Sequence, residues 1–557
     1  PTSERPPRRR AVARRSEVVT VASELRESSP RPEPVVAAFD FGSNSFHLLV
    51  VRGHPDRSFD VLLSEKEMLR LGEEVGLSGK FSPDAISRAA EVATRFHSLA
   101  VNLGADEFVC VATAAFREAE NASTMVEAIR AACGLDVSVI SGHREAELIF
   151  HAVRSFVHVG AAPIVAADLG GGSLEISVGD QRQQYFGASL RLGVGRLIAK
   201  YPPSDPPTRR EIATLRRYVI QQLGPVSERA RDYVPTRLVV TSGSFNALVR
   251  TAEFERFGGD PEQIKKANEP VILDVDAIEG IEGIVLGRTA KARLDHPAID
   301  TRRNDQLPYG YILLRMLIET TGVTEVVASP WALREGLVLD ALERRADFEF
   351  SFGVEELRSG SVKALAGRFL PDLTHVTHVA RLAVSLGAQL PRSLALEAPD
   401  LELLSYACLL HDIGESIAQD NHDRHSAYIV ESVRLRGFSR EEKAIIASLV
   451  RYHRRGTPKA SEYPPFGLLD HRRRERFMTM LAVLRVADAL DRSHQSFVHE
   501  VSMADHGDSA VLEVHCVGDV TLELYGIRRK GQLLEKVLGR VLEISVVSDD
   551  VATDEDP

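Results

Sequence analysis

Two short stretches of this chain combine an acidic residue with a turn of small residues, a pattern suited to phosphate binding. In one of them, an apolar run leads into Asp168, the glycines at 170–172 and Ser173, and an alternating run follows. Consecutive glycines let backbone N–H groups converge on an anion, because no Cβ stands in the way. Asp168 and Glu175 flank this turn, and carboxylates beside bound phosphate favour a divalent cation between them. A glycine cluster alone more often marks only a turn, so a second copy is needed.

The second copy lies upstream. The apolar run 35–39 leads into Asp40, Gly42 and the polar residues 43–45, and another apolar run leaves the turn. A strand, an acidic turn and a returning strand that occur twice, about one small domain apart, indicate a duplicated fold. Two such loops facing one another would hold a chain of phosphates or the phosphate tail of a nucleotide.

The elements that must position these loops alternate between strands and helices. Short apolar runs predict buried strands, and Ser82-Pro83-Asp84 marks the start of a helix. The turn of residues 241–244 follows another apolar run, and such turns line the ligand crevice of open α/β sheets. This order of elements implies two α/β domains. The strands expected outside the two loops are 108–113, 137–140, 238–240 and 325–328, and a further helix is expected near 211–223.

We predict a multidomain chain of class α/β plus α. Helical periodicity holds from Val362 to about Arg492, and strand patterns return from Val511 to Val547 around a short helix. Residues 341–361 are charged and irregular, which favours a linker. The expected parts are a disordered tail at 1–33, α/β domains at 34–159 and 160–345, a helical domain at 346–500, and a small α+β domain with an acidic tail at 501–557.

The composition excludes several classes of protein. Of 557 residues, 44% are hydrophobic and 26% are charged, as in ordinary soluble globular domains. A formal net charge of −11 gives no reason to expect nucleic-acid binding. We find no apolar run of membrane-spanning length, and the N-terminal tail lacks the apolar core of a secretion signal. Four widely spaced cysteines without a Cys-x-x-Cys pair favour a reducing, cytoplasmic setting.

Four motifs taken together resemble the exopolyphosphatase/guanosine pentaphosphate phosphohydrolase family. They follow the family's order within residues 35–340, and they are 40–47, 141–146, 168–173 and 333–336. The resemblance implies two actin-like (ribonuclease-H-like) domains around a cleft, an HD-type helical domain and a small C-terminal α+β domain. It also implies Mg²⁺-dependent removal of a terminal phosphate, with K⁺ as a second candidate ion, and a homodimer.

The resemblance assigns roles to individual residues. Glu145 matches the family's catalytic glutamate, which orients or deprotonates water; in the first turn of a helix it could instead stabilise the helix dipole. Asp40, Asp168 and Glu175 match the acidic, metal-binding positions. Relatives often carry two acidic residues where this chain has Arg144 and Glu145, which would add a cation near the phosphate. The positions matched to phosphate contacts are Gly42, Ser43, Asn44, Ser45, Arg70, Arg117, Gly170, Gly171, Gly172, Ser173 and Gly243.

Residues 375–488 carry a second pattern of metal-binding residue types. Imidazoles and carboxylates at helical positions bind one or two divalent metals, which lower the pKa of a bound water. His378 and His422 are nearby alternatives to the main candidates, and a scaffold without metal is the competing interpretation. The order of residues resembles that of HD-superfamily metal phosphohydrolases, which implies the ligands His375, His411, Asp412, His425, His453 and Asp488.

The sequence therefore predicts an exopolyphosphatase. Inorganic polyphosphate would lie in the cleft, and the basic stretches 451–455 and 471–476 could extend its path. Guanosine pentaphosphate (pppGpp) 5′-phosphohydrolase shares the chemistry and stays an alternative. Two other classes remain open, an ATP-dependent kinase of the same fold and a non-catalytic phosphate or alarmone sensor. A separate nuclease or nucleotidase activity of the helical domain is a further alternative.

Overall fold

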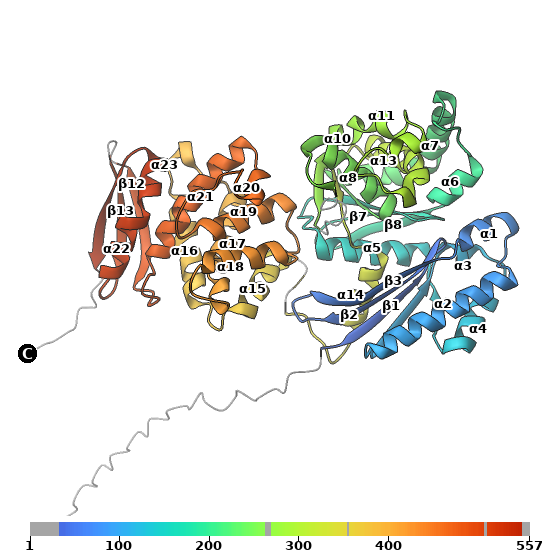
Figure 1. Ribbon diagram of the computed structural model, residues 1–557, viewed down its shortest axis with the longest axis horizontal. Coiled ribbons are helices and arrows are strands. Elements are labelled where there is room, and N and C mark those ends of the chain that lie inside the picture. Colours follow the sequence, from blue (N-terminus) through green and yellow to red (C-terminus); the bar gives the residue numbers. More distant parts are fainter. Residues whose placement is uncertain (1–32, 262–268, 352, 354–355, 506–508, 549–557) are drawn as a thin grey trace, which may run out of the picture. The chain divides into compact units, whose positions relative to one another are not determined.

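The computed structural model describes residues 33–261, 269–351, 353, 356–505 and 509–548 (Figure 1). Its elements form two mixed α/β sheets, a helical domain and a three-stranded sheet with two helices. The predicted N-terminal tail lies outside the described residues except for Glu33, and so does the predicted acidic tail after Ser548.

The first sheet carries the upstream loop. Its strand order is β3-β2-β1-β4-β5, with β1 antiparallel to β2 and parallel to β4. β1 and β2 are almost continuously apolar because helices and neighbouring strands bury both of their faces. The strands are β1 (Val35–Phe41), β2 (Ser45–Gly53), β3 (Phe59–Met68), β4 (Glu107–Ala112) and β5 (Val137–Val139). The helices are α1 (Leu71–Ser78), α2 (Pro83–Asn102), α3 (Ala114–Glu118), α4 (Ala122–Cys133) and α5 (Gly142–Phe156).

The second sheet repeats the first. Its order is β10-β11-β9-β6-β7-β8, so the run β8-β7-β6-β9-β11 corresponds to β3-β2-β1-β4-β5, and β10 is an added antiparallel edge strand. This confirms the duplication predicted from the two loops. The strands are β6 (Ile164–Leu169), β7 (Leu174–Gly179), β8 (Gln184–Leu190), β9 (Arg237–Thr241), β10 (Val271–Asp274) and β11 (Glu325–Ala328). The helices are α6 (Val194–Lys200), α7 (Arg209–Arg231), α8 (Gly243–Phe257), α10 (Val275–Gly280), α11 (Glu282–Val285), α12 (Ala290–Arg293), the 3₁₀ helix η1 (Thr301–Gln306), α13 (Leu307–Thr321) and α14 (Leu333–Arg344).

Two helices connect the sheets. α5 packs on β7 and β8, and α14 packs on both α5 and β1. A Cβ added to Gly336 of α14 would stand 2.1 Å from the carbonyl oxygen of Leu148 in α5, so the close approach of these helices requires glycine. α14 therefore packs with the first sheet, although the predicted boundary at 345 grouped it with the second. The order of the elements along the sequence does not reveal this packing, because the chain returns to the first sheet only after it has completed the second.

The helical domain and the small C-terminal sheet share one apolar core, which includes Ala487, Val514 and Leu534. α15 begins inside the predicted linker at 341–361, and α14 ends inside it. The helices of the domain are α15 (Leu357–Phe369), α16 (Thr374–Ala388), η3 (Arg392–Leu394), α17 (Ala398–Leu410), η4 (Ile413–Ser416), α18 (His422–Ser432), α19 (Arg440–Tyr452), α20 (Pro464–Gly467) and α21 (His471–Ala489). The C-terminal elements are β12 (Val498–Asp505), β13 (Ser509–Cys516), α22 (Thr521–Lys530), α23 (Gln532–Leu538) and β14 (Val541–Ser548).

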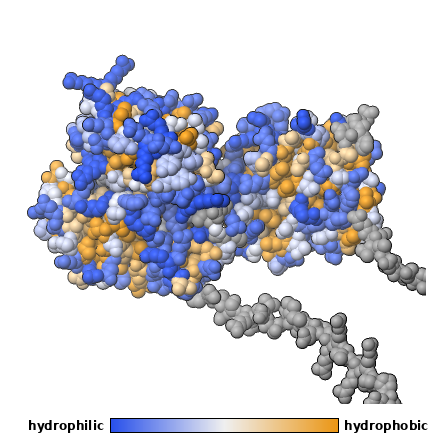
Figure 2. All heavy atoms as spheres, turned by 180° about the vertical axis from the view of Figure 1, so that it is seen from behind, coloured by the Kyte–Doolittle hydropathy of each residue, from blue (hydrophilic) through white to orange (hydrophobic). Residues whose placement is uncertain are grey.

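The surface is mixed in character. The face in Figure 2 intersperses hydrophilic and hydrophobic residues, and exposed apolar side chains such as Leu77, Val234 and Tyr428 come from different parts of the chain. Isolated exposed apolar residues are ordinary on a protein surface. Among the helices that the structure describes, none combines the length and the apolarity needed to cross a membrane. The four cysteines are free thiols.

Candidate functional site

The upstream loop (residues 40–45) and the downstream loop (residues 168–173) have the same internal geometry. In the upstream loop the N–H of Gly42 donates to the carbonyl of Ser45 at 3.1 Å, and in the downstream loop Gly170 donates to Ser173 at 3.0 Å. These bonds close each turn, so the two loops share one backbone hydrogen-bond pattern.

The two loops are in direct contact. A Cβ added to Gly171 would stand 2.4 Å from Nδ2 of Asn44, and a Cβ added to Gly172 would stand 2.9 Å from Oγ of Ser43. This close approach requires both glycines, since neither has a positive φ. Within the described part of the chain, the N–H groups of Gly171 and Gly172 donate to no protein acceptor. They are therefore available to phosphate oxygens.

The strands behind the loops supply the carboxylates. Asp40 lies near the end of β1 and Asp168 near the end of β6, and Glu175 lies directly opposite Asp168 in the β6–β7 pair. The equivalent place opposite Asp40 belongs to His47, so the duplication does not extend to this residue. Oγ1 of Thr241 donates a hydrogen bond to Oδ1 of Asp168 and holds that carboxylate in one orientation.

Glu145 lies in the first turn of α5, which Ser141 caps by accepting the N–H of Arg144 at 3.1 Å. Arg117 donates from Nη1 to Oε2 of Glu145 at 2.7 Å and to the carbonyl of Ile140 at 3.0 Å. Only 6% of Glu145 is exposed. Stabilising the helix dipole would not require a buried carboxylate with a guanidinium partner, so the geometry favours the catalytic interpretation of Glu145.

A cavity of about 380 Å³, called the cleft below, lies beside this ion pair. Elements of both halves line it, since Arg117 comes from α3 and Ser189 from β8. Arg191 adds a guanidinium that is 76% exposed. The cleft therefore joins the partner of Glu145 to the downstream loop. Its lining residues are Ala114, Arg117, Glu118, Gly142, His143, Ser173, Ala188, Ser189 and Arg191.

Burial raises the pKa values of four carboxyl groups near the loops, those of Asp40, Glu145, Asp168 and Glu175. Burial, together with the charge of Glu145, raises the pKa of Asp40 to about 7. Burial also raises the pKa of Asp168, and it raises the pKa of Glu145 against the opposing charge of Arg117. The pKa of Glu175 lies well above its ordinary value because of burial and the charges of Glu145 and Asp168. A cation beside these carboxylates would favour their ionised forms.

The unused acceptor atoms of these carboxylates fit such a cation. Among the described residues, Oδ1 of Asp40 and Oε2 of Glu175 are buried and have no hydrogen-bond partner. Oε1 of Glu175 accepts a hydrogen bond from Ser189 at 2.7 Å. The carboxylates do not form a set of three ligand atoms within 4.8 Å of one another in the described chain. Mg²⁺ suits this arrangement, because it commonly takes one or two carboxylates and completes its shell with waters and substrate phosphates.

The other predicted phosphate contacts have different surroundings. Arg70 is exposed, and its backbone N–H donates at 2.9 Å to the carbonyl of Asn44 in the upstream loop. Gly243 begins α8 under the guanidinium of Arg303, which an added Cβ would overlap. Oγ of Ser45 lies 2.8 Å from Nε2 of His47, at the start of β2.

Arg144 does not add a free cation to the site, contrary to the sequence-based expectation. Its guanidinium pairs with Asp340 of α14 at 2.6 Å and with Glu147 at 2.9 Å. The chain returns to the first sheet through α14, and this packing brings Asp340 to Arg144. The two residues are 196 positions apart, so the sequence does not indicate the contact.

Four cations that the sequence analysis did not assign meet at Lys66, on which the charges of Arg302, Arg303 and Arg334 all act. Lys66 and Arg334 also interact with Asp40. Burial and the charges of Arg303, Arg334 and Arg302 lower the pKa of Lys66. Like charges held together in this way favour an anion between them. The signals in the sequence were the Arg302-Arg303 pair and the place of Arg334 in the 333–336 motif. We call these four residues the basic cluster.

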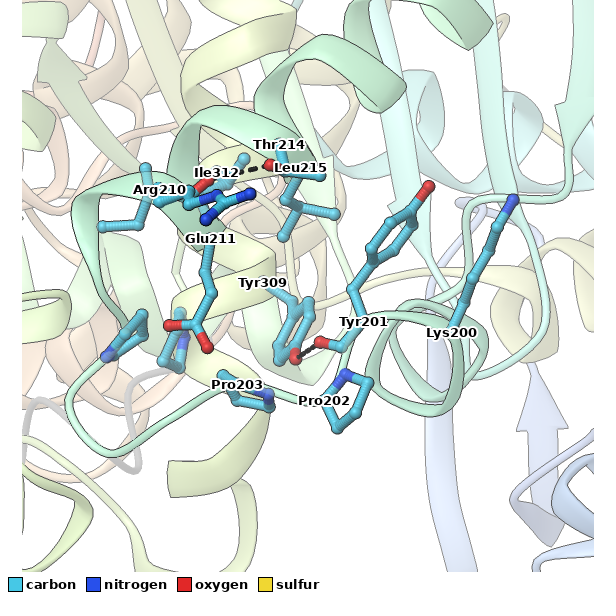
Figure 3. Close-up of a pocket in the computed structure, with 13 residues that line it drawn as sticks. Lys200, Tyr201, Pro202, Pro203, Arg210, Glu211, Thr214, Leu215, Tyr309 and Ile312 are labelled. Carbon is cyan, nitrogen blue, oxygen red and sulfur yellow. Dashed lines mark hydrogen bonds between the residues drawn. The ribbon is translucent and has the colours of Figure 1, made fainter.

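A second cavity, of about 320 Å³, is lined by none of the predicted site residues. Figure 3 shows Glu211 on one side of it, where this carboxylate caps α7 by accepting the N–H of Thr208 at 2.7 Å. The O–H of Tyr309 donates to the carbonyl of Tyr201. These polar groups stabilise local structure. The apolar lining consists of Tyr201, Pro202, Pro203, Pro207, Ile212, Leu215, Pro308, Tyr309 and Ile312.

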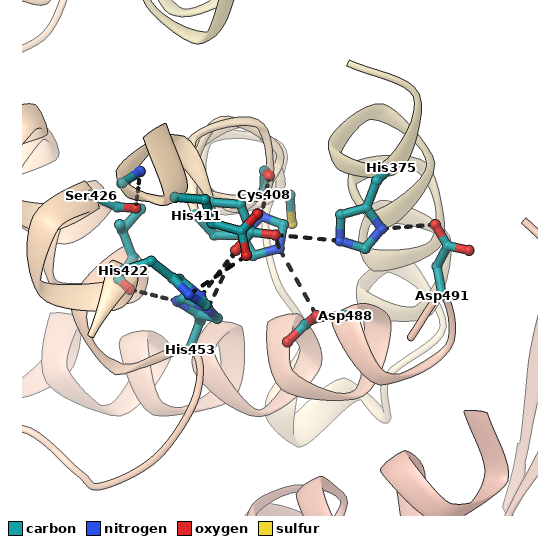
Figure 4. A network of polar contacts seen from close by, with 12 residues as sticks. His375, Cys408, His411, His422, Ser426, His453, Asp488 and Asp491 are labelled. Atoms are coloured by element: carbon teal, nitrogen blue, oxygen red, sulfur yellow. Dashed lines mark hydrogen bonds and ion pairs between the residues drawn. The ribbon is translucent and has the colours of Figure 1, made fainter. Parts of the chain in front are cut away.

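The helical domain brings four histidines and two aspartates together (Figure 4). Each imidazole uses Nδ1 on an outer acceptor and turns Nε2 toward the centre, which is the orientation of metal-ligating histidines. The Nδ1 contacts are His375 with Asp491 at 2.8 Å, His411 with the Cys408 carbonyl at 2.6 Å, His422 with the Gln419 carbonyl at 3.0 Å and His453 with the Val450 carbonyl at 2.7 Å.

Asp412 lies at the centre of this cluster. Its Oδ2 is 3.3 Å from Nε2 of His411 and 3.6 Å from Nε2 of His375. Its Oδ1 is 3.3 Å from Nε2 of His422 and 3.7 Å from Nε2 of His453. Two groups of three ligands thus share one carboxylate, each with its ligand atoms within 4.8 Å of one another. In the described structure, Nε2 of both His375 and His411 is buried without a hydrogen-bond partner.

The structure puts His422 in this cluster in place of the predicted His425. Nε2 of His422 lies 3.2 Å from Nε2 of His453, whereas Cβ of His425 packs near Gly414. Residues three apart on a helix point in directions that differ by roughly 60°, and the rotation of α18 turns His422 rather than His425 toward the cluster. Asp488 stands at the other side, with Oδ1 3.9 Å from Nε2 of His411.

The duplicated sheets, the facing loops and the buried carboxylates define a phosphate-binding α/β protein of the actin-like class. An exopolyphosphatase structure from Cytophaga hutchinsonii shares this fold, with a TM-score of 0.51 at 24% identity over 57% of this chain and 100% of that one. Residues 50–345 match the Ppx/GppA phosphatase family, and residues 357–520 match domain III of that family. The chain belongs to the Ppx/GppA phosphatase family.

Two curated relatives have the same name, exopolyphosphatase 1. The protein of Mycobacterium leprae is 33% identical over 313 residues, which cover 56% of this chain and 91% of the relative. The protein of Mycobacterium tuberculosis is 31% identical over 313 residues, which cover 56% of this chain and 89% of the relative. Most of each relative's length is therefore represented here.

Proposed function

We propose that this protein is an exopolyphosphatase, a phosphoric anhydride hydrolase that removes the terminal phosphate of inorganic polyphosphate in the cleft. The observation that carries the proposal is the contact between two phosphate-binding loops beside the buried Glu145, which Arg117 orients at 2.7 Å. The likeness to the mycobacterial exopolyphosphatases supports the choice of substrate. A homodimer and a cytoplasmic location stay part of the proposal.

The groups that lie behind and beside the cleft have separate roles in this reaction. Glu145 accepts a proton from water as the water oxygen bonds to phosphorus and the P–O–P bond to the rest of the chain breaks. The N–H groups of Gly171 and Gly172 stabilise charge on the transferring phosphate. Asp40, Asp168 and Glu175 would hold Mg²⁺, which when bound neutralises the negative charge of the phosphate oxygens.

The basic cluster supplies the place for the phosphates that follow the terminal one. Its cations repel one another in the free protein, and a polyanion relieves that repulsion. The basic stretch 471–476 is less suited to this role, because Arg473 pairs with Glu441 and Arg476 pairs with Asp400 at 2.9 Å.

The test is phosphate release from long-chain polyphosphate with Mg²⁺, compared between the wild type and Glu145→Gln. Release should collapse in this variant and persist in Glu147→Gln, which changes a side chain that is 51% exposed on the same helix. Undiminished release by Glu145→Gln would contradict the proposal. Equal or faster turnover of guanosine pentaphosphate would instead favour the alarmone phosphohydrolase, and tight binding without turnover would favour a sensor. Phosphate transfer that requires ATP would favour a kinase.

We further propose that the helical domain is of the HD type and binds two divalent transition-metal ions. Four inward-facing imidazole Nε2 atoms with two aspartates make a nitrogen-rich ligand set, which suits such metals better than Mg²⁺. The proposed ligands are His375, His411, Asp412, His422, His453 and Asp488.

Metal analysis of the purified chain tests this second proposal. We expect two metal ions per chain by mass spectrometry and less than half that amount in Asp412→Asn, because Asp412 serves both ligand groups. Asp420→Asn changes an exposed aspartate between η4 and α18 and should leave the metal content unchanged. A wild type without bound metal after loading with Mn²⁺ or Zn²⁺ would refute the proposal.

A further inference from the structure

The second cavity, of about 320 Å³, has the size and the lining of a small-molecule site. Its floor is buried, since Leu215, Tyr309 and Ile312 are at most 5% exposed. Its rim carries the exposed Pro202 and Pro203. Faces of tyrosine and proline pack well on a planar ring. The cavity shares no lining residue with the cleft, so the two sites can be occupied together.

The loop that forms the rim is stiff. Residues 201–208 contain four prolines, whose φ angles are fixed and which donate no N–H. Glu211 of α7 clamps this loop, since its Oε1 accepts the N–H of Ser204 at 3.1 Å and its Oε2 accepts the N–H of Thr208 at 2.7 Å. The cavity is therefore preformed, which lowers the entropy cost of ordering a ligand there.

Two cations border the cavity without a carboxylate partner. Among the described residues, the exposed guanidinium of Arg210 has no hydrogen-bond acceptor or ion-pair partner. In the same part of the chain, the ammonium group of Lys200 lies 3.9 Å from the ring centroid of Tyr218 and contacts no carboxylate. Figure 3 shows the two cations on opposite sides of the cavity. Glu211 is the acidic residue among those that line it, and both of its oxygens already serve the loop. The lining therefore favours an apolar ring that carries a negative charge.

α6 connects this cavity to the downstream loop. At its start, the N–H of Val194 donates at 3.0 Å to the carbonyl of Gly170 in that loop. The N–H of Gly195 donates at 3.0 Å to the carbonyl of Gly171. At its end, Lys200 lines the cavity. Because α6 has seven residues and spans only about 10 Å, a ligand that fixes its end also fixes its start.

The opposite wall connects the cavity to the basic cluster. Tyr309 and Ile312 belong to α13, which follows directly on η1, and η1 carries Arg302 and Arg303. α6 also packs on both η1 and α13. The residues that a ligand would contact therefore lie on the segments that position the downstream loop and two cations of the basic cluster.

We propose that the second cavity is a regulatory site for a small aromatic anion, and that its occupation strengthens phosphate binding at the downstream loop. The anionic group pairs with the planar guanidinium of Arg210 through two N–H groups, and the ring lies against Tyr201 and Tyr309. Such a ligand stabilises the arrangement in which α6 holds the downstream loop, and phosphate binds the same arrangement. Each ligand therefore raises the affinity of the other by the same factor. The binding site stands on the cavity alone, whereas the coupling rests on the proposed function.

The probe is 2-naphthoate, titrated by calorimetry into the full chain with Glu145→Gln, so that added polyphosphate stays intact. 2-Naphthamide supplies the ring without the charge, and sulfate supplies a charge without the ring. We expect one 2-naphthoate site per chain with a Kd below about 1 mM, and binding of both controls that is weaker by about tenfold or more. Arg210→Gln should weaken 2-naphthoate binding by about tenfold, whereas Arg209→Gln, an exposed neighbour outside the lining, should not. Thr214→Trp fills the cavity and should abolish binding while the circular dichroism spectrum stays unchanged.

The coupling is measured in both directions on the same protein. Saturating polyphosphate should lower the Kd of 2-naphthoate by about threefold or more, and saturating 2-naphthoate should lower the Kd of polyphosphate by the same factor. Binding of either ligand that ignores the other would overturn the regulatory role.

The remaining outcomes decide the site itself. No saturable binding of 2-naphthoate, or binding that survives both Arg210→Gln and Thr214→Trp, would overturn it. Binding of 2-naphthamide or sulfate as tight as that of 2-naphthoate would overturn the preference for an aromatic anion. If the chain does not bind polyphosphate, the proposed function and the coupling fail together, and the titrations of 2-naphthoate still decide the site.

Discussion

Replacing Arg117 by methionine should move the pH dependence of catalysis in the cleft. Arg117 donates to Glu145 at 2.7 Å, and Glu145 is 6% exposed. Arg117 opposes the effect of burial on Glu145, so its removal raises the pKa of Glu145 further. The lost hydrogen bond to a charged group corresponds to about 1.5–3 kcal/mol. Glu145 must be ionised to accept a proton, so this energy corresponds to a fall of about 10- to 100-fold in kcat/KM on the acid side of the pH profile. Above the new pKa, activity should recover.

The assay is phosphate release from long-chain polyphosphate, with kcat/KM measured between about pH 5 and pH 10. Arg191→Met is the matched control, because this guanidinium lines the same cleft and contacts Glu118 at 3.4 Å. It should raise KM without moving the midpoint of the pH profile. If Arg117→Met lowers activity equally at every pH, Arg117 acts by binding phosphate only, and the reasoning about Glu145 fails.

Three other perturbations test the site. The pKa of Asp40 is raised from 3.8 to about 7, so the folded chain retains a proton that the unfolded chain releases, and the stability of the metal-free protein must fall as pH rises through this range. Asp40→Asn should remove this loss of unfolding free energy, up to about 4 kcal/mol, and should therefore raise Tm more at pH 8 than at pH 4. An equal change in Tm at the two pH values would contradict the raised pKa of Asp40. Gly193→Ala would place a Cβ 2.2 Å from the backbone carbon of Gly172 and should reduce phosphate release more than 100-fold by displacing the downstream loop. Gly367→Ala, with nothing within 4 Å of the added Cβ, should instead stabilise α15 by about 1 kcal/mol and leave phosphate release unchanged. Treatment with EDTA should stop phosphate release and Mg²⁺ should restore it, and release that continues without metal would exclude Mg²⁺ from the cleft.

The positions of the two loops could be predicted from the sequence because their cause is local. A run of apolar residues, an acidic residue and a turn without Cβ atoms specify a strand and an anion-binding turn wherever they occur. The repetition of this unit, with Asp40 in one copy and Asp168 in the other, was enough to predict a duplicated fold, and the matching strand orders confirm it. The helix start at Ser82 and the strand at 325–328 were likewise predictable from local signals.

The partners of the site residues could not be predicted in this way. Arg117 meets Glu145, Arg144 meets Asp340, and these contacts depend on how α3, α5 and α14 pack. The choice of His422 over His425 depends on the rotation of α18 about its axis, since the two residues lie on neighbouring directions of one helix. A rotation of this kind is set by the apolar residues that the helix buries and not by the histidines themselves.

The sequence by itself determined which residue types are available for phosphate and metal chemistry, where the turns lie, and that the fold is duplicated. Only the tertiary structure decided which of these residues meet, as in the contact of Asn44 with Gly171 or of His422 with His453. The reason is that turns and periodicity arise from interactions between chain neighbours. Contacts between distant residues arise from the burial of large apolar surfaces, to which the polar site residues contribute little.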